Sequence, residues 1–140
     1  MGDGGRLTRA FDASALIALI KNEPGAAITE ALLADTSSVR LVHAVNLIEV
    51  YYHFVRLGDE ARIEADLREL QQGGLITRRD IGFPFWRRVA RLKADLRWVS
   101  LGDSFVIALA QEAGGEVVTA DHGEFDLVAA RGVCPVQFIR

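Results

Sequence analysis

The sequence predicts an α/β fold, in which helices cover both faces of a mostly parallel central sheet. Short apolar segments of strand length alternate with longer segments of helical periodicity along the chain, as in domains built from strand–helix–strand units. The chain has 140 residues, of which 50% are hydrophobic, so it can build one substantial core but hardly two. We therefore expect a single three-layer domain over residues 1–140, with residues 1–6 flexible ahead of the first strand.

The first half of the chain alternates strands with helices. Polar Thr8 and Arg9 interrupt the first strand, and a segment from Asn22 to Gly25 that contains a proline separates the first two helices. The apolar run that ends at Val45 leads directly into a helix that is apolar on nearly every side. The expected elements are a strand at Leu7–Phe11, helices at Ala15–Lys21 and Ala26–Ala34, a strand at Val39–Val45 and a helix at about Asn46–Leu57.

The second half continues the pattern with shorter strands. Oppositely charged pairs four residues apart support a helix around Ile63, and the pair Gly73-Gly74 ends it. Phe85 and Val89 recur at core spacing in the basic helix that follows. The expected elements are a helix around Ile63–Leu70, a strand at Leu75–Arg78, helices at Pro84–Trp98 and Leu101–Ala113, a strand at Glu116–Thr119, a short helix at Asp126–Arg131 and a strand at Pro135–Ile139.

The composition excludes several classes of protein. The formal net charge is −3, which is not the basic balance of a protein that coats nucleic acid. The apolar runs are far shorter than the roughly 20 residues that a membrane-spanning helix needs, and the N-terminus lacks the basic-then-apolar order of a signal peptide. A single cysteine, Cys134, excludes an internal disulfide, and the histidines lack zinc-site spacing. We expect a cytoplasmic protein that does not associate with membranes.

Four acidic residues lie at the ends or openings of predicted elements: Asp12, Glu49, Asp103 and Asp121. In a parallel α/β sheet, ligands bind at the carboxyl ends of the strands, so acids at these junctions converge even when they are distant in sequence. Clustered carboxylates repel one another unless a cation shares the site. Carboxylate oxygens favour hard cations such as Mg²⁺ and Mn²⁺, which proteins commonly use to handle phosphates. The pattern therefore indicates metal-assisted phosphodiester chemistry.

Each of these acids also has a purely structural interpretation. Asp12 would cap the helix that it opens, assisted by Ser14. Two segments match a capping box, in which the first residue caps a helix and an acid three residues later closes the turn: Asn46 with Glu49, and Ser100 with Asp103. A helix N-terminus favours an ionised carboxylate, and this suits a metal ligand as well as a cap. Position along the chain does not separate the two interpretations.

Other polar residues lie close to the four acids. Asn46, Glu49, His53 and Arg56 form one polar stripe on an otherwise apolar helix, which is either its solvent face or the wall of a site. After Asp121, the residues Glu124 and Asp126 are either further ligands or plain loop acids. We interpret His122 as a loop residue, because two-metal chemistry needs no histidine base.

The basic residues concentrate in the middle of the chain. Arg87, Arg88 and Arg91 lie on one predicted helix, mainly opposite its apolar positions. A run of charges of this kind usually solvates a helix face. The alternative is that these arginines bind an anionic substrate.

The segments Phe11–Leu16, Val45–Val50, Leu101–Ala110 and Thr119–Phe125, taken in this order, resemble the PIN domain and most closely the VapC-type toxins of prokaryotic toxin–antitoxin pairs. The resemblance covers nearly the whole chain. It departs from the family pattern in the polar first strand and in Gly123, where larger residues are common.

The resemblance implies a PIN-like three-layer fold and a Mg²⁺- or Mn²⁺-dependent endoribonuclease of a type II toxin–antitoxin system. The matching acids Asp12, Glu49, Asp103 and Asp121 would be both its catalytic residues and its metal ligands. Supporting roles would fall to Ser14, Asn46, Thr119 and Glu124. The implied partners are the RNA substrate, a small antitoxin that covers the active-site groove, and a second copy of the chain.

Two other classes of function compete with this one. The first is a binding module on the same fold that acts through antitoxin or dimer contacts without catalysis. The second is a phosphotransfer domain of the haloacid-dehalogenase or receiver type. A dehalogenase-type domain needs a second aspartate where this chain has Ser14, and a receiver needs a lysine late in the sheet, where this chain has none beyond Lys93.

Overall fold

The computed structural model describes residues 5–140 and confirms the expected α/β architecture. One five-stranded sheet has the strand order β3-β2-β1-β4-β5, and each neighbouring pair is parallel. All its strands therefore end at the same edge, where the chain leaves each strand for the next helix or loop. The strands are β1 (Thr8–Phe11), β2 (Val39–His43), β3 (Ile76–Arg78), β4 (Glu116–Thr119) and β5 (Val136–Phe138).

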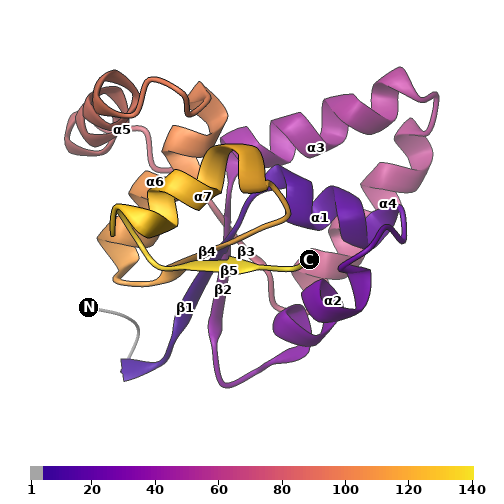
Figure 1. The fold of residues 1–140 in the computed structure, drawn as a ribbon. Helices are drawn as coiled ribbons and strands as arrows, with labels where there is room; N and C mark the ends of the chain where they lie inside the picture. Colours follow the sequence, from indigo (N-terminus) through magenta and orange to yellow (C-terminus); the bar gives the residue numbers. More distant parts are fainter. Residues whose placement is uncertain (1–4) are drawn as a thin grey trace.

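Helices cover both faces of the sheet, as Figure 1 shows. On one side α5 packs against α6, and α7 lies beside them; on the other side are α1, α2, α3 and α4. The helices are α1 (Ala13–Ile20), α2 (Ala26–Ala34), α3 (Ala44–Arg56), α4 (Glu60–Gln72), α5 (Phe83–Asp95), α6 (Leu101–Ala113) and α7 (His122–Ala130).

The central strands build two separate apolar layers. Ala10 of β1 and Val117 of β4 belong to the cluster beneath α5, α6 and α7, while Phe11 and Val118 belong to the cluster beneath α1, α3 and α4. Consecutive residues point to opposite faces because the side chains of a strand alternate. With both faces buried, β1 and β4 are fixed in position, and so are the residues at their carboxyl ends.

The last helix begins four residues earlier than the sequence predicted. It starts at His122 because Asp121 adopts an extended conformation and accepts a hydrogen bond from the backbone N–H of Glu124. This is the geometry of an N-cap, and it makes His122 the first residue of α7 rather than a loop residue. The prediction of a start at Asp126 was wrong because the local cap was not recognised. The other elements lie within a few residues of their predicted bounds.

The predicted flexibility of residues 1–6 falls mainly on residues 1–4, which lie outside the described part of the chain. Arg6, which is described, donates hydrogen bonds to the carbonyl groups of Thr36 and Ser38 at 3.1 and 2.9 Å. Within residues 5–140, the structure contains no helix with the length and apolar character needed to cross a bilayer. Cys134 is a free, buried thiol.

Candidate metal centre

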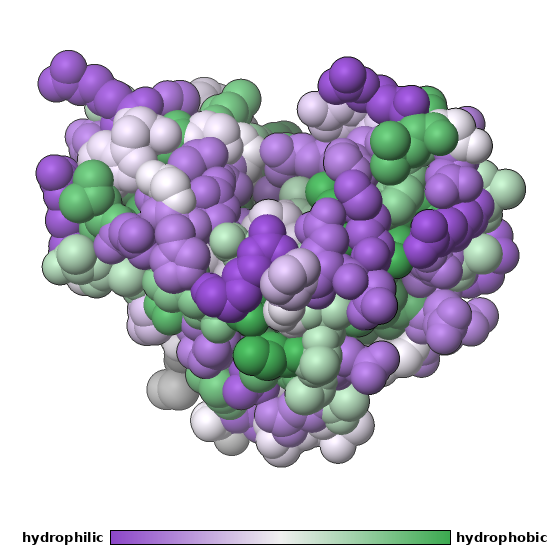
Figure 2. Space-filling model, turned by 45° about the vertical axis from the view of Figure 1, so that its right-hand side comes forward, coloured by the Kyte–Doolittle hydropathy of each residue, from purple (hydrophilic) through white to green (hydrophobic). Residues whose placement is uncertain are grey.

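The four predicted acids come together in one pocket at the carboxyl edge of the sheet. The pocket has a volume of about 350 Å³ and draws its walls from α1, α3, α6 and the start of α7. In Figure 2 the molecule is hollowed between two lobes, and hydrophilic residues predominate around the hollow. The lining residues are Asp12, Ala13, Ser14, Ile17, Glu49, Tyr52, His53, Ser100, Asp103, Asp121 and Glu124.

Asp12 is the most buried of the four acids, with a residue exposure of 1%. It caps α1 and also lines the pocket, so the structural and the functional interpretation of this residue are both correct. Its Oδ1 accepts from the N–H of Ala15 at 2.9 Å and from the hydroxyl of Ser14 at 2.8 Å. Its Oδ2 accepts from the hydroxyl of Thr119 at 2.5 Å. One lone pair of Oδ2 therefore remains free for a cation.

Two hydroxyl groups connect Asp12 to the end of β4. The oxygen of Ser14 accepts from the N–H of Ala120 at 2.9 Å, and the oxygen of Thr119 accepts from the N–H of Asp121 at 2.9 Å. The predicted supporting positions thus tie the first acid to the loop that presents the fourth. Because each hydroxyl donates to Asp12 and accepts from the backbone, the carboxylate is held in one orientation.

Glu49 enters the pocket from the second turn of α3. Its Oε1 accepts from the side-chain amide of Asn46 at 3.0 Å, and the same amide donates to the carbonyl of Gly102 at 3.0 Å. Asn46 is fully buried and so ties α3 to the first turn of α6. Its other side-chain atom, Oδ1, has no hydrogen-bond partner among the described residues. Gly102 leaves room for the carboxylate of Glu49, because a Cβ at this position would lie 2.6 Å from Oε2 and the carboxylate would have to move.

The capping-box interpretation of Asn46 and Glu49 was wrong. The helix begins at Ala44, and His43 is its cap, accepting through Nδ1 from the N–H of Val45 at 3.1 Å. The imidazole of His43 is buried and stacks on Phe85, so the core selects this cap in place of the asparagine. Asn46 is thereby released to orient Glu49. The polar stripe on α3 forms part of the site wall, since Glu49 and His53 both line the pocket.

The capping box predicted at Ser100 and Asp103 is half formed. The hydroxyl of Ser100 accepts from the N–H of Asp103 at 3.1 Å, as expected for the cap. The reciprocal bond is absent, because the N–H of Ser100 donates to Oε1 of Glu124 at 2.5 Å instead. Glu124 therefore replaces Asp103 in the box. The carboxylate of Asp103 is left to face the pocket, and the first turn of α6 favours its negative charge.

The carboxylates of Asp103, Asp121 and Glu124 form the tightest group in the pocket. One oxygen atom from each lies within 4.8 Å of the others. Oxygen ligands of Mg²⁺ lie at 2.0–2.1 Å, so two ligands on one ion are separated by up to about 4.2 Å, and small side-chain adjustments would close this group around a cation. The all-oxygen donor set fits Mg²⁺ or Mn²⁺ and not the nitrogen and sulfur sites of zinc.

The electrostatics of the pocket also fit a cation. Burial raises the pKa of Asp12 to about 6, against the hydrogen bonds from Thr119, Ala15 and Ser14. Burial and then the charge of Asp12, together with a hydrogen bond to Glu124, raise the pKa of Asp103 well above its usual range. Burial likewise raises the pKa of Glu49. Without a cation, Asp103 therefore retains a proton at neutral pH that an isolated aspartate would have lost.

Other predicted candidates lie outside this group. Asp126 is exposed and binds Nδ1 of His122 at 2.7 Å, so it is not a member of the acidic group. His122 stacks on Phe138 and contacts the carbonyl of Arg140 through Nε2 at 2.7 Å, which directs its ring to the C-terminal strand. Neither residue lines the pocket. Arg87, Arg88 and Arg91 line a different hollow, between α5 and α6.

Four lining residues were not predicted as site residues from the sequence: Ala13, Ile17, Tyr52 and Ser100. Tyr52 and Ile17 add apolar surface to the lining, and Ser100 supplies the N–H that holds Glu124. The sequence predicted Ser100 as a helix cap, but no neighbouring residue indicated that its N–H would bind Glu124. The sequence did not indicate which apolar positions of α3 are exposed, because an apolar residue on a largely apolar helix is ordinarily assigned to the core.

The chain matches the model of the PIN domain family over residues 10–131. No curated protein sequence is similar enough to count as a match.

Solved structures share the fold at low sequence identity. A chain of VapBC2 from Rickettsia felis, solved with a DNA fragment from its promoter, is 14% identical with a TM-score of 0.72, over 94% of this chain and 98% of that one. A chain of DNA-bound VapBC from Salmonella typhimurium is 17% identical with a TM-score of 0.72, over 96% and 99%. A chain of a toxin–antitoxin complex from Klebsiella pneumoniae is 19% identical with a TM-score of 0.67, over 94% and 98%.

Proposed function

This chain belongs to the PIN domain family, and on that premise we propose that it is a metal-dependent endoribonuclease. The observation that carries the proposal is the convergence of five carboxylates from four parts of the chain in one pocket: Asp12, Glu49, Asp103, Asp121 and Glu124. A folded protein tolerates such a cluster only if protons or a cation compensate its charge. A pocket with these ligands and an open mouth suits a phosphodiester substrate.

We assign Asp103, Asp121 and Glu124 as direct metal ligands, with Asp12 and Glu49 completing the site. A bound Mg²⁺ or Mn²⁺ would lower the pKa of a coordinated water and offset the charge that develops on the phosphate. Asp12 contributes one free lone pair of Oδ2, held in place by Ser14 and Thr119.

The protein's own carboxylates govern the proton balance of the site. Asp103 holds a proton at neutral pH when no cation is present, because burial, the charge of Asp12 and a hydrogen bond to Glu124 all raise its pKa. Loading the site must release this proton, so cation affinity rises with pH. Because burial disfavours the charged form of Asp12 and Glu49, cation binding would favour their ionisation as well.

The biological role that we propose is that of the toxin in a type II toxin–antitoxin pair, acting on RNA in the cytoplasm. The support is the likeness in fold to chains of VapBC and other toxin–antitoxin complexes. A small antitoxin would cover the pocket, and a second copy of the chain would complete a homodimer. Exposed apolar residues on α3, among them Ile48 and Tyr52, supply surface for such contacts.

The test of the nuclease is cleavage of a mixed pool of structured cellular RNA by the antitoxin-free protein, with Mn²⁺ and with EDTA. Asp103→Asn should abolish metal-dependent cleavage while thermal unfolding shows that the fold survives. Asp126→Asn removes an acid of the adjacent helix that lies outside the pocket, and it should leave cleavage unchanged. Cleavage by Asp103→Asn at the wild-type rate would contradict the site. A folded protein that shows neither cleavage nor stabilisation by Mn²⁺ would favour the non-catalytic binding module.

A further inference from the structure

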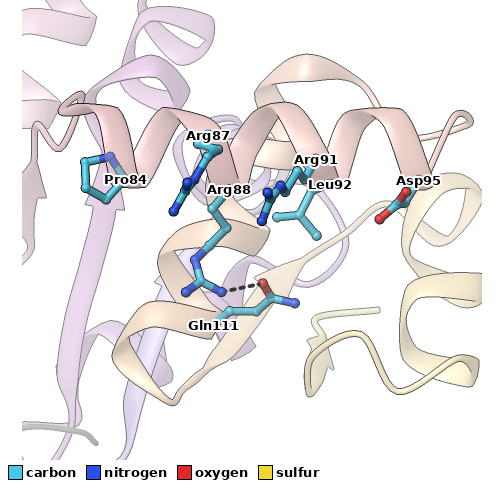
Figure 3. Close-up of a pocket in the computed structure, with 7 residues that line it drawn as sticks. All are labelled: Pro84, Arg87, Arg88, Arg91, Leu92, Asp95 and Gln111. Carbon is cyan, nitrogen blue, oxygen red and sulfur yellow. Dashed lines mark hydrogen bonds between the residues drawn. The ribbon is translucent and has the colours of Figure 1, made fainter.

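A second hollow lies between α5 and α6, and its chemistry is opposite to that of the acidic pocket. It has a volume of about 290 Å³ and presents three arginine side chains toward the last turns of α6, as Figure 3 shows. One acid, Asp95, lies at its far end. The lining residues are Pro84, Arg87, Arg88, Arg91, Leu92, Asp95 and Gln111.

The three arginines of this hollow have no ion-pair partner among the residues that the structure describes. Across residues 5–140, no carboxylate oxygen lies within the 4.0 Å of an ion pair from the nitrogen atoms of Arg87, Arg88 or Arg91. Other arginines are used differently: Arg9 pairs with two acids, and Arg78 does as well. In a chain of net charge −3, a hollow with this local excess of cations favours an anion.

Two of the arginines are exposed, and each contacts a neighbouring side chain that orients its guanidinium. Arg88 donates to Oε1 of Gln111 at 3.3 Å, and the amide of Gln111 donates in turn to the carbonyl of Val133 at 2.9 Å. The guanidinium of Arg87 lies over the ring of Phe83, 5.0 Å from its centre. A guanidinium that is already oriented loses less conformational entropy when it forms the two parallel hydrogen bonds that a phosphate accepts.

Exposed aromatic side chains on the same helix favour a nucleic-acid strand over an acidic protein segment. Phe83 and Trp86 are 53% and 46% exposed and contact each other edge to face at 4.9 Å. Single-stranded nucleic acids are held by cations that contact the backbone together with aromatic rings on which bases stack. An acidic peptide would use the cations and leave the rings unused.

The distance from the hollow to the acidic pocket would allow one RNA strand to contact both. Gln111 follows Asp103 by eight residues of α6, which places the two about 12 Å apart along the helix axis. At roughly 3.4 Å per nucleotide of a stacked strand, this corresponds to three or four nucleotides.

We propose that the hollow lined by Arg87, Arg88 and Arg91 binds a backbone phosphate of single-stranded RNA a few nucleotides from the scissile bond. The proposal rests on the proposed nuclease for its substrate, but the site itself is defined by binding and not by cleavage. It separates the functions of two surfaces, since the acidic pocket acts on the scissile phosphate and the arginine hollow holds the strand.

The test measures binding of a fluorescent single-stranded RNA of mixed sequence to the Asp103→Asn protein in EDTA, over a series of salt concentrations. Arg88→Gln should weaken binding roughly tenfold, the effect of losing a charge-assisted hydrogen bond. It should also reduce the slope of log affinity against log salt concentration by about 0.7, which is the contribution of one phosphate contact on a single strand. Arg88→Gln/Arg91→Gln should lower both quantities further. Arg68→Gln is the matched control, because Arg68 is an exposed arginine of α4 on the opposite side of the sheet.

Equal affinity and equal salt slope in Arg88→Gln and Arg68→Gln would overturn the proposal, provided that thermal unfolding shows both to be folded. Failure of the Asp103→Asn protein to bind RNA at any salt concentration would overturn it too. Cleavage by the wild-type chain, measured separately, then shows whether the proposed nuclease stands without this site.

Discussion

Replacing Asp12 with asparagine should stabilise the metal-free protein at neutral pH while removing its response to metal. The carboxylate of Asp12 is buried, and burial disfavours the ionised form that a cation would bind. Asparagine has nearly the same shape and is a good N-cap, so its Oδ1 can still accept from Ala15 and Ser14. Its amide would face Thr119, whose hydroxyl can accept in place of donating.

The expected gain in the free energy of unfolding follows from the pKa of Asp12. A rise from 3.8 to about 6 means that the folded state holds a proton that the unfolded state has released, so stability falls as pH rises from about 4 to 7. The free energy of unfolding falls by about 3 kcal/mol over the whole titration, and about 1.4 kcal/mol of this fall lies between pH 5 and 8. Allowing about 1 kcal/mol for the rearranged hydrogen bond, Asp12→Asn should gain about 2 kcal/mol at pH 8 and under 1 kcal/mol at pH 5. The raised pKa of Asp103 makes stability fall with pH in the same direction.

Urea unfolding of both proteins in EDTA at pH 5 and pH 8, followed by circular dichroism, measures these differences. The denaturant slopes should agree, so that the shift in midpoint reports stability alone. Mn²⁺ should then stabilise the wild type by about 2.7 kcal/mol at a concentration 100 times the dissociation constant, and Asp12→Asn hardly at all. A variant that is less stable than the wild type at pH 8, or one whose advantage is the same at both pH values, would refute the reasoning.

Three further predictions concern the site and the core. Gly102→Ala should lower the rate of RNA cleavage at least tenfold, because the new Cβ would displace the carboxylate of Glu49. The control Gly73→Ala should cleave at the normal rate, because its nearest Cβ contact would be an ordinary 3.4 Å. Equal rates in the two variants would contradict the close approach of Gly102 to Glu49. Mn²⁺ affinity measured by calorimetry should rise between pH 6 and 8, as the raised pKa of Asp103 requires, and a flat profile would show that no proton is released. Phe125→Ala should lower the free energy of unfolding by about 3–5 kcal/mol in urea, since the side chain is fully buried, and a loss below 1 kcal/mol would mean that the core collapses around the gap.

Most of the fold could be predicted from the sequence because periodicity is a local property. The helix at Leu101–Ala113 and the strand at Glu116–Thr119 have their predicted bounds, since a serine cap, a long apolar run and a glycine stop define them within a few residues. The starts of α3 and α7 were missed for one shared reason. Each depends on which of several polar residues caps the helix, and at α3 the burial of His43 against Phe85 decides the choice.

The candidate site was predictable as a set of residues but not as an arrangement. The positions of Asp12, Asp103 and Asp121 at element boundaries indicated that they meet, because parallel strands end at one edge. The partners that hold them were not predictable. Thr119 donates to Asp12 across 107 positions of the chain, and no local pattern encodes such a pair.

The sequence by itself determined the order of the elements, the two-sided burial of the sheet and the acids at its edge, because these depend on residue type and on spacing within a few positions. Tertiary structure alone decided which acid accepts from the N–H of Ser100. The bond from the N–H of Ser100 to Glu124 spans 24 positions and leaves Asp103 free for the site. It also decided that the glycine beside Asp103 makes room for Glu49. Such choices depend on distances between helices, and these distances exist only after the core has packed.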